Sequence, residues 1–129
     1  METIEGRILE LRMKGYCCSQ LVASIVGLDP LGEENDMLLE SMHGLCVGMY
    51  SWRACGVLTS AACALSLHMS GNSLKESCGE LADWFEARFG GVDCKNLIGL
   101  GGVPIQICWD AVKETCEKCF EILTERDCL

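Results

Sequence analysis

Apolar side chains recur every three or four residues along most of this 129-residue chain, the spacing that places them on one face of an α-helix. The stretch from Ala54 to Met69 differs, because nearly all of its residues are small or apolar. It contains serine, threonine and histidine and is too short for a bilayer span, so it predicts a buried central helix. No segment alternates apolar and polar residues as a half-buried strand does. The pattern therefore predicts an all-α protein.

Glycine, proline and capping residues divide this pattern into separate helices. The expected segments are Thr3–Met13, Cys18–Val26, Glu33–Leu45, about Cys55–Met69, Ser73–Phe89, a short turn Cys94–Ile98, and a final helix from about Pro104 or Ile105 to Arg126. We expect Asn72 or Ser73 to cap the fifth of these. A glycine-rich link with Gly99, Gly101 and Gly102 precedes the last. We therefore predict a single domain over residues 1–129, built as a bundle of about five or six helices.

Composition supports a helical bundle and excludes some partners. Half of the residues are hydrophobic but only 6% are aromatic, which favours packed helices with small aliphatic side chains. The net charge of −9 argues against nucleic acid, which is bound through cationic contacts to phosphate. The first residues lack the basic-then-apolar layout of a signal peptide, and we expect a cytoplasmic protein without a membrane span. We expect the methionines at 13, 37, 42, 49 and 69 to fill the core.

The chain contains 11 cysteines, which is unusual for its length. A disulfide scaffold is disfavoured because the number is odd, no export signal is evident and the core is large enough to fold without staples. In a reducing compartment, such a chain suggests use of cysteines for metal binding, a cluster or redox chemistry.

Four cysteines stand out because each lies at or near the start of an expected helix: Cys18, Cys55, Cys94 and Cys108. A helix start offers free N–H groups and a positive dipole end, which stabilise a thiolate and lower its pKa. Residues three, four and seven positions after Cys18 and after Cys108 are mostly apolar, so both thiols are expected to point inward. These four thiols are predicted to converge on one site.

Other cysteines fall inside expected helices, where a thiol usually packs as a small hydrophobe: Cys63, Cys78, Cys116 and Cys119. The last two form a CxxC motif deep in the final helix, and we interpret them as packing rather than as a second redox or metal pair. We expect Cys46, in the stretch Gly44–Gly48, to approach Cys55 and to be the best substitute fifth thiol.

Four segments together resemble a family of small redox-active proteins with a C, CGAxxG, C, C pattern: GYCCSQ (Gly15–Gln20), CGVLTS (Cys55–Ser60), FEARFGGVDCKNLIG (Phe85–Gly99) and ICWDAV (Ile107–Val112). The resemblance implies that Cys18, Cys55, Cys94 and Cys108 are the family cysteines, the set reached above from helix position. Val57 and Ser60 depart from the pattern's Ala and second Gly. The family is also similar to the iron–sulfur portion of a split-Soret cytochrome, which favours a cluster, and its genes accompany transporter genes, which implies a link to a transport system.

These observations favour an iron–sulfur protein, most simply with a [2Fe–2S] centre, that carries or senses electrons. Two alternatives remain: a dithiol/disulfide oxidoreductase in which two of the four cysteines cycle, and a structural zinc site made by the same four thiols. In a fourth interpretation all the thiols are packing. No nucleophile–base–acid set is evident, which favours a redox carrier, sensor, accessory protein or oxidoreductase over a hydrolase or transferase. The expected partner is an unidentified redox protein, and the acidic, methionine-containing surface is compatible with a homodimer.

Overall fold

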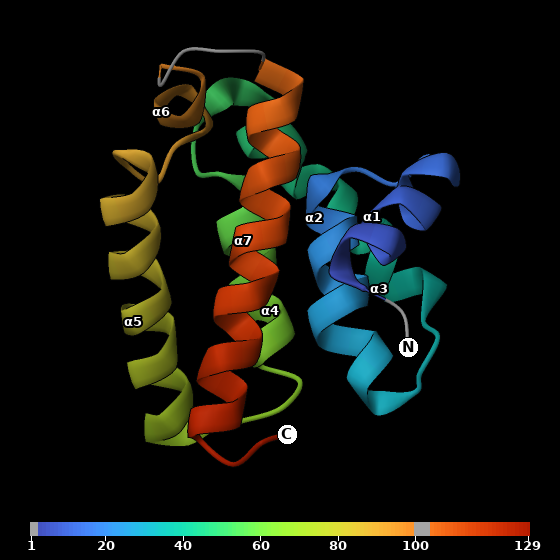
Figure 1. The fold of residues 1–129 in the computed structure, drawn as a ribbon, viewed down its shortest axis with the longest axis vertical. Helices are drawn as coiled ribbons and strands as arrows, with labels where there is room; N and C mark the ends of the chain where they lie inside the picture. The colour runs from blue at the N-terminus through green and yellow to red at the C-terminus, as the bar shows by residue number, and fades with distance from the viewer. Residues whose placement is uncertain (1–2, 100–103) are drawn as a thin grey trace.

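Seven α-helices, joined by short 3₁₀- and π-helical turns, make up the computed structural model, which describes residues 3–99 and 104–129 (Figure 1). The α-helices are α1 (Ile4–Met13), α2 (Cys18–Val22), α3 (Asp36–Ser41), α4 (Gly56–Leu65), α5 (Gly71–Phe89), α6 (Cys94–Ile98) and α7 (Pro104–Glu125). The all-α prediction is confirmed, with more helices than the five or six expected. Gly101 and Gly102 of the predicted link lie outside the described residues.

Irregular helical turns account for most differences in helix boundaries. The helix expected at Cys18–Val26 is α2 followed directly by the π-helical η1 (Ala23–Leu28) and the 3₁₀ turn η2 (Asp29–Leu31). The helix expected at Glu33–Leu45 is α3 followed by the 3₁₀ turn η3 (Met42–Leu45). The helix α3 begins at Asp36 rather than at the predicted Glu33, because the Asn35 side chain accepts a 3.0 Å hydrogen bond from the Leu38 N–H and so caps α3.

The core forms where α7 packs against α4, α5 and α2, while α4 also packs on α2. Figure 1 shows α5, α7 and α4 running side by side, with α1, α2 and α3 grouped beside them. Phe85 and Phe89 of α5 are fully buried, and their ring centroids lie 4.7 Å apart. Within the described residues, none of the helices has the length and apolar character that crossing a bilayer requires.

Two expectations about packing have mixed outcomes. Cys116 and Cys119 are completely buried in α7, which confirms their packing role. Cys63, in contrast, is exposed on α4, so the prediction that it packs in the core was wrong. Met13, Met37 and Met49 are also exposed, because they lie on helix faces or turns that no other element covers.

Residues 47–52, here called the strap, connect η3 to α4 and include the π-helical turn η4 (Gly48–Trp52). Four consecutive residues have left-handed φ values, namely Val47 (53°), Gly48 (56°), Met49 (59°) and Tyr50 (54°), and Trp52 follows at 61°. This conformation costs about 1–2 kcal/mol for each residue other than glycine. Such strain persists only where the surrounding structure fixes the chain, and the strap is held at both ends.

The anchors of the strap are a disulfide and a set of backbone hydrogen bonds. At one end Cys46 is bonded to Cys17, the residue that precedes α2. At the other end the Arg53 N–H donates to the carbonyl of Gly48 at 3.3 Å, and the Arg53 carbonyl accepts from the Cys94 N–H at 2.7 Å. The strap therefore joins the start of α2 to the starts of α4 and α6.

Candidate functional site

An apolar cavity of about 190 Å³ lies where the starts of α2, α4 and α6 meet the first turns of α7. Its lining includes all four cysteines predicted from helix position: Cys18, Cys55, Cys94 and Cys108. The remaining wall is apolar and consists of Val47, Trp52, Val57, Leu97 and Ile98. The structure thus brings together thiols that are up to 90 positions apart in the sequence, and among the described residues no charged side chain lines the cavity they share.

Two of these thiols are placed by backbone hydrogen bonds between the end of the strap and the segment before α6. The Cys55 N–H donates to the carbonyl of Val92 at 2.9 Å, and the Cys94 N–H donates to the carbonyl of Arg53 at 2.7 Å. Cys55 is therefore the N-cap residue of α4 and Cys94 the first residue of α6, side by side. The sequence correctly placed both at helix starts, but it gave no sign of the bridge that pairs them.

The thiols of Cys55 and Cys94 interact directly. The Cys55 S–H donates to the Cys94 sulfur, which lowers the pKa of Cys94 to about 7, and the Gly56 N–H also donates to that sulfur. The same bond, together with burial, raises the pKa of Cys55 far above its ordinary value. In this pair Cys94 therefore loses its proton more readily than Cys55.

The other two thiols are less acidic than an ordinary cysteine. Burial and the nearby Cys108 and Cys94 raise the pKa of Cys18 to about 11, despite N–H donors from Val47 and Ser19. Burial and the nearby Cys94 also raise the pKa of Cys108. The expectation that a helix start would lower all four pKa values was wrong for three of them. Desolvation outweighs the backbone donors at Cys18 and is the main cause at Cys108, while the pKa of Cys55 is raised mainly by its hydrogen bond to Cys94.

The four thiols are not arranged around a single point. In the described ranges 3–99 and 104–129, no group of three or more histidine, cysteine, aspartate or glutamate side chains is positioned to hold one metal ion. Cys55 and Cys94 are in contact, but the four sulfurs do not converge on one centre, and the described part of the apolar wall offers no cation to neutralise several thiolates at once.

A family model described as "Putative redox-active protein (C_GCAxxG_C_C)" matches residues 16–125, a span that includes all four thiols of the cavity. The chain belongs to this family. No curated protein and no solved structure matches it significantly. The family description names redox activity, and its pattern of single cysteines around a glycine-containing motif agrees with a chemistry centred on these thiols.

The family description prints the second motif as GCAxxG, so with its cysteine at Cys55 the departures fall on Ala54, Gly56 and Thr59, and the expectation that they fall on Val57 and Ser60 was wrong. Val57 and Ser60 nevertheless support the site. Val57 is fully buried and forms part of the wall. The Ser60 hydroxyl is buried and donates to the carbonyl of Ser19, so it links α4 to α2 immediately behind Cys18. Serine at this position thus tightens the contact between two helices that carry cavity thiols.

Cys46 does not serve as a fifth thiol of this cavity. It is bonded to Cys17, with the two Cα atoms 6.4 Å apart, so the prediction that it substitutes beside Cys55 was wrong. The adjacent cysteines of the CC pair thus have separate roles, since Cys18 faces the cavity and Cys17 holds the strap. The disulfide joins positions 29 residues apart, and no sequence signal identifies that pairing.

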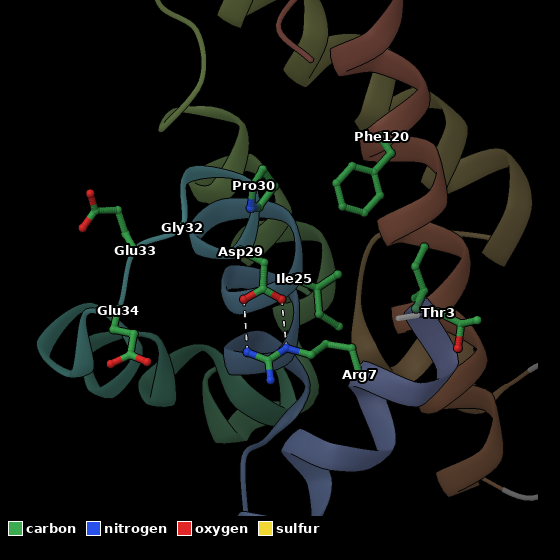
Figure 2. A pocket seen from close by; sticks show the side chains of 10 residues that line it. Thr3, Arg7, Ile25, Asp29, Pro30, Gly32, Glu33, Glu34 and Phe120 are labelled. Atoms are coloured by element: carbon green, nitrogen blue, oxygen red, sulfur yellow. Dashed lines mark hydrogen bonds and ion pairs between the residues drawn. The ribbon is translucent and has the colours of Figure 1, made fainter. Parts of the chain in front are cut away.

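A larger hollow of about 600 Å³ lies away from the thiols, between the start of α1 and the loop after η2 (Figure 2). Arg7 and Asp29 face each other across part of it, with bonds of 2.9 and 3.1 Å. Glu33 and Glu34 lie on the loop and carry further negative charge. Because Asp29 already engages the guanidinium of Arg7, the described lining of this hollow presents no free cation for an anionic ligand.

Proposed function

We propose that Cys18, Cys55, Cys94 and Cys108 bind an iron–sulfur cluster, most simply [2Fe–2S], and that the protein carries or senses electrons through it. The observation that supports this most directly is the single apolar cavity lined by all four thiols. Four cysteine thiolates are the usual ligands of such clusters. Membership in a family described as redox-active agrees with the proposal.

The size of the cavity favours a group of several atoms. One zinc ion holds its thiolates at about 2.3 Å, so the sulfurs must converge on one point. The described residues contain no such convergent group, and the cavity of about 190 Å³ is several times the roughly 30 Å³ share of one water in the liquid. The spacing of the four sulfurs and the volume of the cavity therefore suit a multi-atom centre better than a single zinc ion.

The electrostatics of the cavity also favour a metal centre. Burial in the apolar pocket and repulsion between neighbouring thiolates raise the pKa of Cys18 and Cys108, whereas the pKa of Cys55 is raised mainly by its hydrogen bond to Cys94 and then by burial. Positive metal ions remove this repulsion, because a coordinating thiol loses its proton outright. When bound, a cluster accepts and releases single electrons. The N–H groups of Val47 and Gly56 donate to the cavity sulfurs, and such donors tune the reduction potential.

The test is the metal and sulfide content of protein purified without oxygen. We expect the parent to contain iron and acid-labile sulfide, with visible charge-transfer absorption. Cys55→Ser removes one ligand, so we expect it to contain at least about tenfold less of both, the loss that even weaker changes around metal ligands produce.

Cys63→Ser is the matched control, because Cys63 lies on the same helix but is exposed and outside the cavity. It should match the parent in iron, sulfide and absorption. Zinc without iron in the parent contradicts the cluster and supports the structural zinc site. Protein without any metal contradicts both and supports thiol–disulfide cycling.

A second function, as a dithiol/disulfide oxidoreductase, is favoured by one specific observation, the hydrogen-bonded pair of Cys55 and Cys94. A thiolate with a lowered pKa beside a protonated thiol is the arrangement of an attacking and a resolving cysteine. Cys94 is the half-buried member and Cys55 the buried one, so Cys94 is the proposed nucleophile.

This second function predicts a graded alkylation pattern in the reduced, metal-free protein. With the pKa of Cys94 lowered to about 7 and that of Cys18 raised to about 11, Cys94 carries far more thiolate than Cys18 at pH 8. Iodoacetamide should therefore modify Cys94 before Cys18, and the rate at Cys94 should fall about tenfold per pH unit below its pKa. Peptide mass spectrometry measures each rate, and equal rates for Cys94 and Cys18 at pH 8 would contradict the assigned pair.

A further inference from the structure

The disulfide between Cys17 and Cys46 lies directly beside the four-thiol cavity without forming part of its wall. Each of its cysteines precedes a residue of the cavity, because Cys18 follows Cys17 and Val47 follows Cys46. The Val47 N–H donates to the Cys18 sulfur. The start of α2 and the strap are thus joined twice at neighbouring positions, by one covalent bond and by one hydrogen bond.

The strap depends on this anchor for its shape. Val47, Met49, Tyr50 and Trp52 have left-handed φ values that such residues rarely adopt, and Val47 is β-branched. Met49, Tyr50 and Trp52 are more than half exposed, so little packing holds the middle of the strap. Its conformation is therefore imposed from its ends, one of which is the disulfide.

The surroundings accommodate the reduced pair as well as the disulfide. Ser19 Oγ lies 2.9 Å from Cys46 Sγ and 3.3 Å from Cys17 Sγ, and it donates its own proton to the carbonyl of Met42 at 2.7 Å. Its lone pairs are therefore available to accept from a thiol. A buried Cys46 S–H formed on reduction has a hydrogen-bond acceptor already in place.

We propose that Cys17 and Cys46 are a reversible redox couple that opens and closes the four-thiol cavity, with a dithiol as the reductant. The thiolate of the dithiol attacks Cys17 Sγ, which is half-buried, while Cys46 is 2% exposed. The S–S bond breaks, and Cys46 leaves as a thiolate and takes up a proton. The second thiol of the reductant then displaces Cys17, so two electrons and two protons pass to the protein and the reductant becomes a disulfide.

Reduction releases one end of the strap. The left-handed residues then relax, which moves Val47 and Trp52 off the cavity and removes the Val47 N–H from Cys18. In a reducing compartment, where we expect this protein to act, disulfides are transient and serve catalysis or redox sensing. The inference requires only the cavity and the strap, and it holds whichever group the four thiols bind.

The test uses metal-free protein equilibrated with mixtures of reduced and oxidised dithiothreitol. Peptide mass spectrometry reports the state of the Cys17–Cys46 bond, the hydrogen exchange of residues 47–52 and the alkylation rate of Cys108. We expect the exchange and the alkylation to increase at least about tenfold as this one bond is reduced. Cys46→Ser should give the fast rates in every mixture.

Cys63→Ser should respond as the parent does, because Cys63 lies outside both the cavity and the strap. If Cys46→Ser fails to fold, the comparison of the two redox states of the parent decides the question without a variant. Rates that are the same in both states overturn the proposal, as does a bond that never forms in any mixture. The proposed cluster is tested separately by iron and sulfide content, so failure of one proposal is distinguishable from failure of the other.

Discussion

Replacing Gly56 by alanine is expected to lower the free energy of unfolding by about 3 kcal/mol, because the new methyl group has no space. A Cβ at Gly56 overlaps the carbonyl oxygen of Leu45 and lies 3.5 Å from the Cα of Cys46. Both are backbone atoms, so no side chain can rotate away. To make room, the start of α4 must move away from the end of η3. This movement takes Cys55 away from the strap.

Chemical denaturation of reduced, metal-free protein, followed by circular dichroism, measures this effect. Gly79→Ala is the matched control, because Gly79 lies within α5 and a Cβ there meets nothing within 4 Å. It should stabilise the protein by about 0.5–1 kcal/mol through the higher helix propensity of alanine. If Gly56→Ala leaves stability unchanged, or raises it as Gly79→Ala should, the close approach of α4 to Leu45 is refuted.

Replacing Phe85 by alanine is expected to cost about 3–5 kcal/mol, the usual effect of removing a buried aromatic ring. Phe85 is fully buried, and its ring centroid lies 4.7 Å from that of Phe89 and 6.3 Å from that of Trp84. The substitution leaves a cavity between α5 and the rest of the core and removes both aromatic contacts.

The same denaturation experiment tests this prediction. Met37→Ala is the control, since Met37 is 81% exposed on α3 and its truncation should change stability by no more than about 0.5 kcal/mol. A loss of less than about 1 kcal/mol for Phe85→Ala would place this ring outside the cooperative core.

The amphipathic helices could be predicted because local periodicity and capping determine them. The start at Cys94 and the end at Phe89 agree with the sequence reading, since Asp93 and Gly90 are an N-cap and a C-cap of ordinary type. The fifth predicted helix begins earlier than expected, at Gly71, because Ser70 takes the extended conformation of an N-cap.

Which cysteines share the four-thiol cavity could also be predicted. Inward-facing positions at helix starts converge when the helices meet at one end of a bundle, and Cys18, Cys55, Cys94 and Cys108 do line one cavity. Which sulfurs are in contact depends on the backbone hydrogen bonds of Arg53 and Val92, which connect segments distant in sequence.

The strap and the disulfide could not be predicted from local patterns. Val47 and Tyr50 have side chains that disfavour the left-handed region, so their conformation is the result of tertiary anchors. The exposure of Cys63 has a different cause. The segment around it is almost uniformly small or apolar, so periodicity carries no information about which face of α4 is buried.

The placement of Cys108 in α7, after every other element of the fold, has a consequence for biosynthesis. A chain emerging from the ribosome presents Cys18, Cys55 and Cys94 well before Cys108 and before the helix that packs against α2, α4 and α5. Domains generally fold as units during synthesis. The cavity is therefore completed only after α7 has emerged, and whatever it binds must be delivered after Cys18, Cys55 and Cys94 have already left the ribosome.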